Sequence, residues 1–352
     1  MIALSCGVNG SVLMRAAGGV LLALGLVQAM AVDPQVSASM GDGLLRVSGR
    51  FTRTNGVVTL LESCDPGAGW EPVAAFPISE GQTTLSSDGG GMGAGDAHFF
   101  RLQVESIELP WEMVWIEEGE FLMGSPESDV LSQPRERPQH VVRVEPGFWM
   151  SKYEVTQAKY EELMGVNPST YAVGGNVPVE TVSWEMAMEY CRKLTAREMQ
   201  AGRLPEGYVY RLPTEEEWEY ACRAGTSTSW SFGDDQGLLT AYAWWGRGDA
   251  GGHPHAVGTK IRNAWGLYDM HGNVFEHCLD LLAPYPGGPE ESNPTLRVTR
   301  GGSFYCPNSV VRSADRSHSQ PPDHREWLYG LRVVLGSEHA LEERGLLYDT
   351  GS

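Results

Sequence analysis

Residues 210–225 constrain the fold of this chain more than any other stretch, because they contain a complete set of signals for one helix. Pro213 ends a short extended segment, and Thr214 stands three residues before Glu217, in the spacing of a capping box. Acidic residues in the first turn suit the positive end of the helix dipole. We therefore predict a helix that begins after Thr214 and ends near Gly225, which can close it in a left-handed conformation.

The apolar spacing within the predicted helix indicates which face it buries. Trp218, Ala221 and Cys222 recur at the i, i+3, i+4 spacing of a core-facing stripe. The same reasoning predicts two further helices, capped by Thr156 and Ser183. Their apolar stripes comprise Tyr160, Leu163 and Met164 in the first helix, and Ala187, Tyr190, Cys191 and Leu194 in the second. Short apolar runs between glycine- and tryptophan-rich loops make up the rest, which predicts an α+β domain with little regular secondary structure.

Residues 1–31 have the features of a signal peptide. Arg15 supplies a positive charge, an apolar segment at 16–27 follows it, and Ala29-Met30-Ala31 forms a small-x-small cleavage site. An uncleaved membrane anchor is the alternative, but the apolar run is short for a membrane span. We therefore expect an exported protein, in the periplasm, at the cell surface or outside the cell, with no membrane span after cleavage.

Residues 33–108 differ from the rest, because β-rich runs alternate there with clusters of glycine, aspartate, asparagine and serine. The runs are 44–49, 57–61 and 99–104. Their spacing predicts a small antiparallel all-β module. The glycine-rich segment 86–95 lacks the lysine and the following helix of a phosphate-binding loop, so we interpret it as a hairpin loop.

Pro110-Trp111 marks the boundary between this module and a second domain at 111–335. Residues 336–352 form a short acidic tail. For this tail we expect either a mobile terminus or one loose helical turn.

The chain carries a formal net charge of −19 at pH 7. Such a surface repels nucleic acids and anionic membranes, which argues against both as partners. A basic protein or peptide would be attracted, although the charge also serves solubility.

The stretch RLPTEEEWEYACRAG resembles the pattern RLPTEAEWEYACRGG of the formylglycine-generating enzymes, also called sulfatase-modifying factors. Further motifs of that family occur in the same order, and the resemblance covers residues 111–335. These motifs lie at 113–124, 152–157, 178–184, 263–276, 300–303 and 329–332. The resemblance implies a C-type-lectin-like, asymmetric α+β fold with little regular secondary structure.

Asn273, Val274 and Glu276 match the family's Gly-Asn-x-x-Glu calcium site. Calcium prefers carboxylate, amide and backbone carbonyl oxygens, which these three residues can offer. From the residues alone, a turn followed by a surface acid is the alternative. The resemblance implies a structural calcium ion that fixes a loop.

In aerobic members of this family, two cysteines bind copper(I) and the enzyme oxidises a substrate cysteine to formylglycine. Soft copper(I) prefers thiolates, and two opposed sulfurs leave room for the substrate thiolate. Cys306 matches the first cysteine and Ser303 the active-site serine, whereas Val311 stands at the position of the second cysteine. We therefore do not expect copper chemistry by the two-thiolate route. Cys306 is then either a reactive thiol or a small buried residue.

The resemblance also implies a substrate groove around Cys306, to which we assign Arg312, Arg316 and Trp327. Arginines would lower the pKa of the Cys306 thiol if their charges converge on it. Ser303 has no obvious histidine and aspartate partners for a hydrolytic triad. The histidines form no zinc signature.

Cys191 and Cys222 match family cysteines that form disulfides, but the positions of their partners hold Val333 and Arg316. The resemblance therefore implies that neither bridge can form. The two thiols are free, or they pair with each other if their helices pack together.

Three functions are consistent with these observations. The first is a member that binds a protein or peptide through the groove around Cys306, without the copper oxidase activity. The second is an active oxidase that makes formylglycine on sulfatases with one redox thiol. The third is a lectin-like module that binds a ligand through loop positions 308–328. The valine at 311 favours the first and the third.

Overall fold

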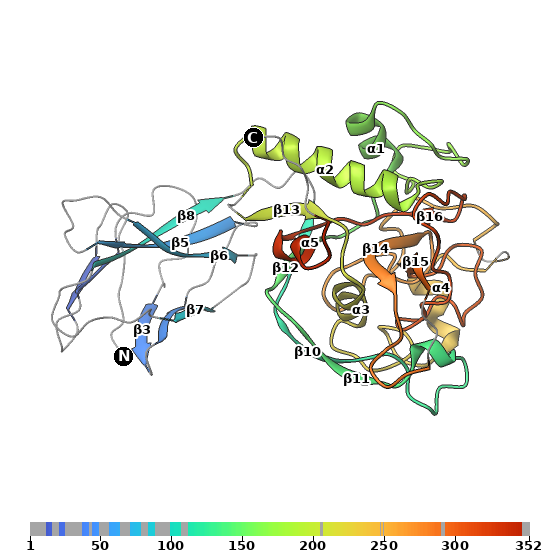
Figure 1. The fold of residues 1–352 in the computed structure, drawn as a ribbon, viewed down its shortest axis with the longest axis horizontal. Coiled ribbons are helices and arrows are strands. Elements are labelled where there is room, and N and C mark those ends of the chain that lie inside the picture. The colour runs from blue at the N-terminus through green and yellow to red at the C-terminus, as the bar shows by residue number, and fades with distance from the viewer. Residues whose placement is uncertain are drawn as a thin grey trace. The chain divides into compact units, whose positions relative to one another are not determined.

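The structure is a computed structural model of the chain. It describes residues 112–204, 207–246, 248, 250–289 and 293–346, and before residue 112 it describes strands alone. The chain divides into two compact units, Met1–Pro110 and Trp111–Ser352. Figure 1 shows the elements of both units.

The described elements of the first unit are all β-strands, as the sequence predicts. They form an antiparallel hairpin of β1 and β2 and two antiparallel sheets with strand orders β3-β4-β7 and β6-β5-β8. The strands are β1 (Val12–Arg15), β2 (Leu21–Leu24), β3 (Ser37–Gly41), β4 (Leu44–Ser48), β5 (Gly56–Ser63), β6 (Glu71–Ile78), β7 (Thr84–Asp88) and β8 (Phe99–Ser106). The predicted runs lie in β4, β5 and β8.

Two predictions for the first unit stay predictions. The hairpin of β1 and β2 falls within the predicted signal peptide. The pairing of these two strands does not show whether the chain is cleaved after residue 31. The predicted glycine-rich loop begins in β7, and the rest of it lies outside the described residues.

The second unit contains a four-stranded antiparallel sheet with the order β13-β17-β12-β9. A separate hairpin pairs β10 with β11, and a third sheet has the order β15-β14-β16, with β16 parallel to β14. The strands are β9 (Met113–Ile116), β10 (Gly119–Met123), β11 (His140–Val144), β12 (Phe148–Ser151), β13 (Tyr208–Arg211), β14 (Phe275–Leu282), β15 (Asn293–Arg300), β16 (Tyr329–Gly330) and β17 (Val334–Ser337). Such short elements joined by long loops agree with the predicted α+β fold.

Helix α3 lies between the β10–β11 hairpin and the β14–β15 pair (Figure 1). The longest helix, α2, lies beside β13, where Thr195 Oγ1 accepts a hydrogen bond from Tyr210 N–H at 2.9 Å. The helices are α1 (Gln157–Met164), α2 (Trp184–Gln200), α3 (Glu215–Arg223), α4 (Leu239–Tyr242) and α5 (His339–Glu342), with short 3₁₀ turns at Pro134–Glu136 and Gln236–Leu238. None of the helices in the described part of the chain is both long and apolar enough for a membrane span.

The three predicted helix caps are confirmed. Thr156, Ser183 and Thr214 each accept a backbone hydrogen bond from the residue three positions on, and Thr214 completes the capping box with Glu217. The predicted stripe of α3 is fully buried. The end of α3 differs slightly from the prediction, because Ala224 already adopts the left-handed conformation, with φ 48°, one residue before Gly225.

The tail, described as far as residue 346, contains the short helix α5 and packs on the domain, which agrees with the expectation of one helical turn. Leu341 in α5 is fully buried. Arg344 donates from Nε to Asp280 Oδ1 at 2.8 Å, and Asp280 accepts from the N–H of Glu215 at the start of α3. One buried leucine and the ion pairs of Arg344 with Asp280 and Glu216 therefore hold the segment that follows β17.

Candidate functional site

A glycine turn leads from β15 into the segment that carries Ser303 and Cys306. Gly301 and Gly302 have φ values of 90° and 73°, in the region that only glycine adopts readily. A Cβ atom at position 302 would lie 2.6 Å from Val311 Cγ1. Glycine at this position therefore lets Val311 pack directly on the backbone of the turn.

Ser303 and Cys306 occupy one tight turn. The N–H of Cys306 donates to the Ser303 carbonyl at 3.0 Å, and Ser303 Oγ lies 3.2 Å from the Cys306 sulfur. Cys306 is 6% exposed, and burial raises the pKa of its thiol to about 11. The thiol is therefore protonated at neutral pH, which makes it a weak nucleophile and a poor metal ligand.

Val311 is fully buried in the same apolar cluster as Cys306. Its carbonyl lies 3.0 Å from His271 Nδ1. His271 Nε2 lies 3.1 Å from the N–H of Ser231, which can only donate, so the histidine proton sits on Nδ1 and is donated to Val311. Burial lowers the pKa of His271 to about 4. An aliphatic side chain, held from its backbone by a neutral histidine, thus lies in the cluster of Cys306 at the position where the resemblance implies a second cysteine.

Partly exposed aromatic residues lie next to this turn. Trp327 packs against Tyr305, with ring centroids 5.1 Å apart, and against Tyr171 at 6.0 Å. Both Tyr171 and Trp327 also contact the buried ring of Phe304. We call Tyr171, Tyr305 and Trp327 the aromatic face. Further partly exposed apolar side chains pack on the Cys306 cluster, namely Leu131, Phe232, Trp245, Val310 and Leu328.

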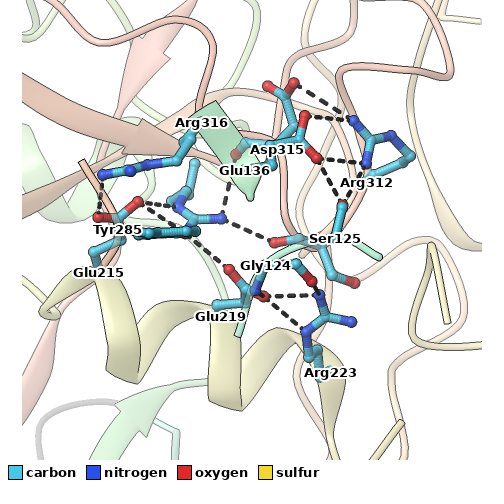
Figure 2. A network of polar contacts seen from close by, with 12 residues as sticks. Gly124, Ser125, Glu136, Glu215, Glu219, Arg223, Tyr285, Arg312, Asp315 and Arg316 are labelled. Atoms are coloured by element: carbon cyan, nitrogen blue, oxygen red, sulfur yellow. Dashed lines mark hydrogen bonds and ion pairs between the residues drawn. The ribbon is translucent and has the colours of Figure 1, made fainter. Parts of the chain in front are cut away.

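Arg312 does not line a groove, which corrects the prediction. Its guanidinium is buried and forms a bidentate ion pair with Glu136 at 2.7 and 2.8 Å. It also donates to Ser125, Asp129 and the Leu131 carbonyl. Arg312 therefore holds the loop 125–136 against the domain, and its charge is neutralised by carboxylates (Figure 2).

Arg316 is buried in the same way and is also not a groove residue. It pairs with Glu215 Oε2 at 2.8 Å and stacks on the ring of Tyr285. Arg300 pairs with Glu215 and Glu219 at 2.8 and 2.9 Å. Figure 2 shows Glu215 and Glu219 rising from α3 into this buried network. These arginines stabilise the fold, and only Trp327 of the predicted groove residues reaches the surface.

The candidate calcium residues lie close together, but the side-chain oxygens of Asn273 and Glu276 are engaged by protein donors. Glu276 accepts from Arg332 Nε at 3.0 Å and from Arg332 Nη2 at 2.7 Å. Its Oε2 also accepts from Trp218 Nε1 at 2.6 Å. Asn273 Oδ1 accepts from the His255 N–H at 3.0 Å. A calcium ion would need these same oxygens, so the residues as they lie do not fit the ion.

No cluster of three or more His, Cys, Asp or Glu side chains with metal-binding geometry occurs among the described residues. Cys191, Cys222, Cys278 and Cys306 are buried thiols that form no disulfide, so Cys191 and Cys222 are not bonded to each other. His271, which bonds to the backbone of Val311, has no role in the sequence-based prediction of the site. Its position directly before the 272–276 motif is the feature of the sequence that could have indicated a place near the site.

Comparison with known proteins identifies the second unit. The model of the sulfatase-modifying factor enzyme 1-like domain matches residues 103–336. A formylglycine-generating enzyme of Streptomyces coelicolor is 34% identical over 237 residues, which cover 61% of this chain and 66% of that protein. A chaperone protein named LppX from Paenibacillus barcinonensis is 29% identical over 235 residues, which cover 53% of this chain and 79% of that protein.

Solved structures have the same fold. PvdO from Pseudomonas aeruginosa is 30% identical, with a TM-score of 0.54 over 64% of this chain and 94% of that chain. Variable protein 1 of Treponema denticola is 28% identical, with a TM-score of 0.55 over 63% of this chain and 94% of that chain. These matches agree with the lectin-like fold that the resemblance implies.

Proposed function

Because the chain belongs to the sulfatase-modifying factor family, we propose that it binds a protein or peptide at the surface around Cys306, without copper-dependent oxidation. The observation that carries the proposal is the pairing of a buried, protonated Cys306 with the aliphatic Val311. A copper(I) site of the kind expected in this family needs two thiolates. One protonated thiol beside a valine does not provide them.

The aromatic face supports recognition at this surface. Tyr171, Tyr305 and Trp327 offer partly exposed rings beside the apolar side chains that cover Cys306. Aromatic residues supply much of the binding energy at protein interfaces, because they bury a large area with few rotatable bonds. The net charge of −19 would attract a basic segment. One relative is named a chaperone, which agrees with a protein partner.

We also propose that the protein is exported, on the basis of the predicted signal peptide in residues 1–31. The partner would then be a periplasmic, surface or extracellular protein. Mass spectrometry of the protein recovered from its native host tests this step. An N-terminus close to Val32 is expected, and a cytoplasmic protein that begins at residue 1 or at Met14 would contradict export.

A random-peptide phage library panned on the purified chain tests the binding function. Enriched peptides should bind the wild type and lose at least about tenfold in affinity to Trp327→Ala, because one buried aromatic anchor commonly contributes that much. The matched control is Val141→Ala, an exposed apolar truncation on β11. Absence of enriched peptides, or equal binding to the Trp327 and Val141 variants, would contradict the proposal.

An active oxidase is the second candidate. It is favoured by the 34% identity with the Streptomyces coelicolor formylglycine-generating enzyme and by the contact of Ser303 with Cys306. Under this alternative, Cys306 would be the only redox thiol and would have to become exposed and deprotonated on substrate binding. A lectin-like ligand site over the loop 308–328 would use the same aromatic rings and would appear in the panning experiment as a failure of peptides to bind.

A further inference from the structure

Arg332 lies where the resemblance implies a structural cation. Its guanidinium is fully buried and contacts Glu276, one of the three candidate calcium residues. We infer that Arg332 is the cation of this site, and that the domain needs no calcium at Asn273, Val274 and Glu276 to hold its loops.

The oxygen atoms that Arg332 gathers are of the kind that calcium would bind. Arg332 Nη1 donates to the Ser151 carbonyl at 2.9 Å, and Nη2 donates to the Tyr268 carbonyl at 2.8 Å. Nε and Nη2 both donate hydrogen bonds to the Glu276 carboxylate. Calcium prefers carboxylate and backbone carbonyl oxygens. The guanidinium therefore connects β12, the loop before β14, and β14 itself. A structural calcium ion would connect segments of the chain in the same way.

Charge and hydrogen bonding at Glu276 are both satisfied without a metal. Glu276 is buried, and a buried carboxylate needs an opposite charge close by. Arg332 supplies that charge at 2.7 Å. Trp218 Nε1 occupies the second carboxylate oxygen at 2.6 Å. A calcium ion would have to displace one of these donors and would then leave the Arg332 guanidinium buried beside another cation.

The neighbouring oxygens do not make up a separate calcium site. Both oxygens of the buried Glu154 accept hydrogen bonds, from Asn273 Nδ2 at 2.6 Å and from the Val274 N–H at 3.0 Å. Asp269 Oδ2 accepts from the Gly258 N–H at 2.7 Å. Asp269 Oδ1 is buried without a hydrogen-bond partner. A single unpartnered side-chain oxygen is far from the six to eight oxygens that calcium collects.

The first test measures thermal unfolding of the full chain in excess EGTA and in millimolar CaCl₂. A ligand that binds only the folded state raises the melting temperature. We expect the same melting temperature under both conditions, or a calcium effect that Glu276→Gln retains in full because the ion binds elsewhere. A stabilisation by calcium that disappears in Glu276→Gln would overturn the inference.

The second test removes the guanidinium. Arg332→Met, Glu276→Gln and the double variant are compared with Arg325→Met, which removes an exposed arginine. Arg332→Met should lower the melting temperature far more than Arg325→Met does, because it leaves Glu276 buried and unpaired. The double variant should recover part of that loss. An Arg332→Met protein as stable as the Arg325→Met control would contradict the inference.

If Arg332→Met does not fold, calcium binding by the wild type remains decisive. Isothermal titration of the EGTA-treated, desalted wild type with CaCl₂ should give no binding that Glu276→Gln removes. Stoichiometric binding that is absent in folded Glu276→Gln would show that Glu276 is a calcium ligand and would overturn the inference.

Discussion

Helix α3 and the turn around Cys306 differ in their relation to the arginines near them: the helix forms ion pairs with arginines, and the turn is packed in apolar side chains. The carboxylates of α3 bind Arg300 and Arg316 in a buried ionic network. The turn around Cys306 is lined by apolar groups, and the guanidinium of Arg312, six residues on, is paired with Glu136. Arginines that are close to Cys306 in sequence thus stabilise the fold and do not activate the cysteine. Proximity in sequence is a poor guide to electrostatic effect where carboxylates from distant segments neutralise the charge.

Removing an arginine from the ion-pair network of α3 should lower the free energy of unfolding more than any other change proposed below. Arg300→Met removes the fully buried partner of Glu215 and Glu219. Loss of one partner from a buried ion pair costs about 3–5 kcal/mol, because the remaining charges stay buried. We expect that loss in the free energy of unfolding from denaturant titration, or a failure to fold.

The matched control for Arg300→Met is Arg143→Met. Arg143 pairs with Glu145 on the surface, and the two side chains are 61% and 55% exposed. Exposed ion pairs contribute less than about 1 kcal/mol. Similar losses in the two variants would mean that the network around α3 does not stabilise the fold as described.

Lowering the pH should weaken the domain through its buried neutral histidines. Burial lowers the pKa of His271 and of His277 to about 4. The unfolded chain then binds protons that the folded chain does not, so stability is present above about pH 6.5 and is lost as the pH falls towards 4. The effect of each histidine is at most on the order of 2–3 kcal/mol.

Unfolding free energies of the wild type and of His277→Gln, measured between about pH 7 and pH 4, test this prediction. Glutamine does not titrate and can keep the hydrogen bond that His277 Nε2 makes to the Val182 carbonyl. The variant should lose less stability over this range than the wild type. Parallel pH profiles would show that His277 is protonated equally in the folded and unfolded states.

Removing the cap of α3 should have the smallest effect. Thr214→Ala removes the side-chain oxygen that accepts from the Glu217 N–H. Loss of an N-cap costs about 1 kcal/mol, whereas Thr214→Ser keeps the hydroxyl and should be close to the wild type. Equal stability of the alanine and serine variants, measured by denaturant titration, would mean that the ion pair of Glu217 with Arg211 holds the helix start by itself.

Structural features of this protein can be predicted from its sequence when the interacting residues are close together in the sequence. The start and buried stripe of α3 are predictable because the capping box and the apolar spacing are local. The burial of Arg312 is not, because its partners Asp129 and Glu136 lie far away in the sequence. The calcium prediction meets the same limit, since the pairing of Glu276 with Arg332 has no local signature. The effect of Val311 can be predicted from the sequence alone. Valine has no thiol, so a two-thiolate copper(I) site cannot form with this residue.

The most direct test of the central claim restores the second thiol. Wild-type protein, Val311→Cys and Cys306→Ala are loaded with copper(I) and incubated under air with a Cys-x-Pro-x-Arg peptide, the sequence that the family resemblance implies as substrate. Copper(I) affinity is measured by competition with a chelator, and the mass of the peptide is followed. We expect weak copper binding and no change of mass with the wild type, and at least about tenfold tighter copper binding in Val311→Cys, because two thiolates suit this ion. Conversion of the peptide thiol to an aldehyde by the wild type, lost in Cys306→Ala, would contradict the account.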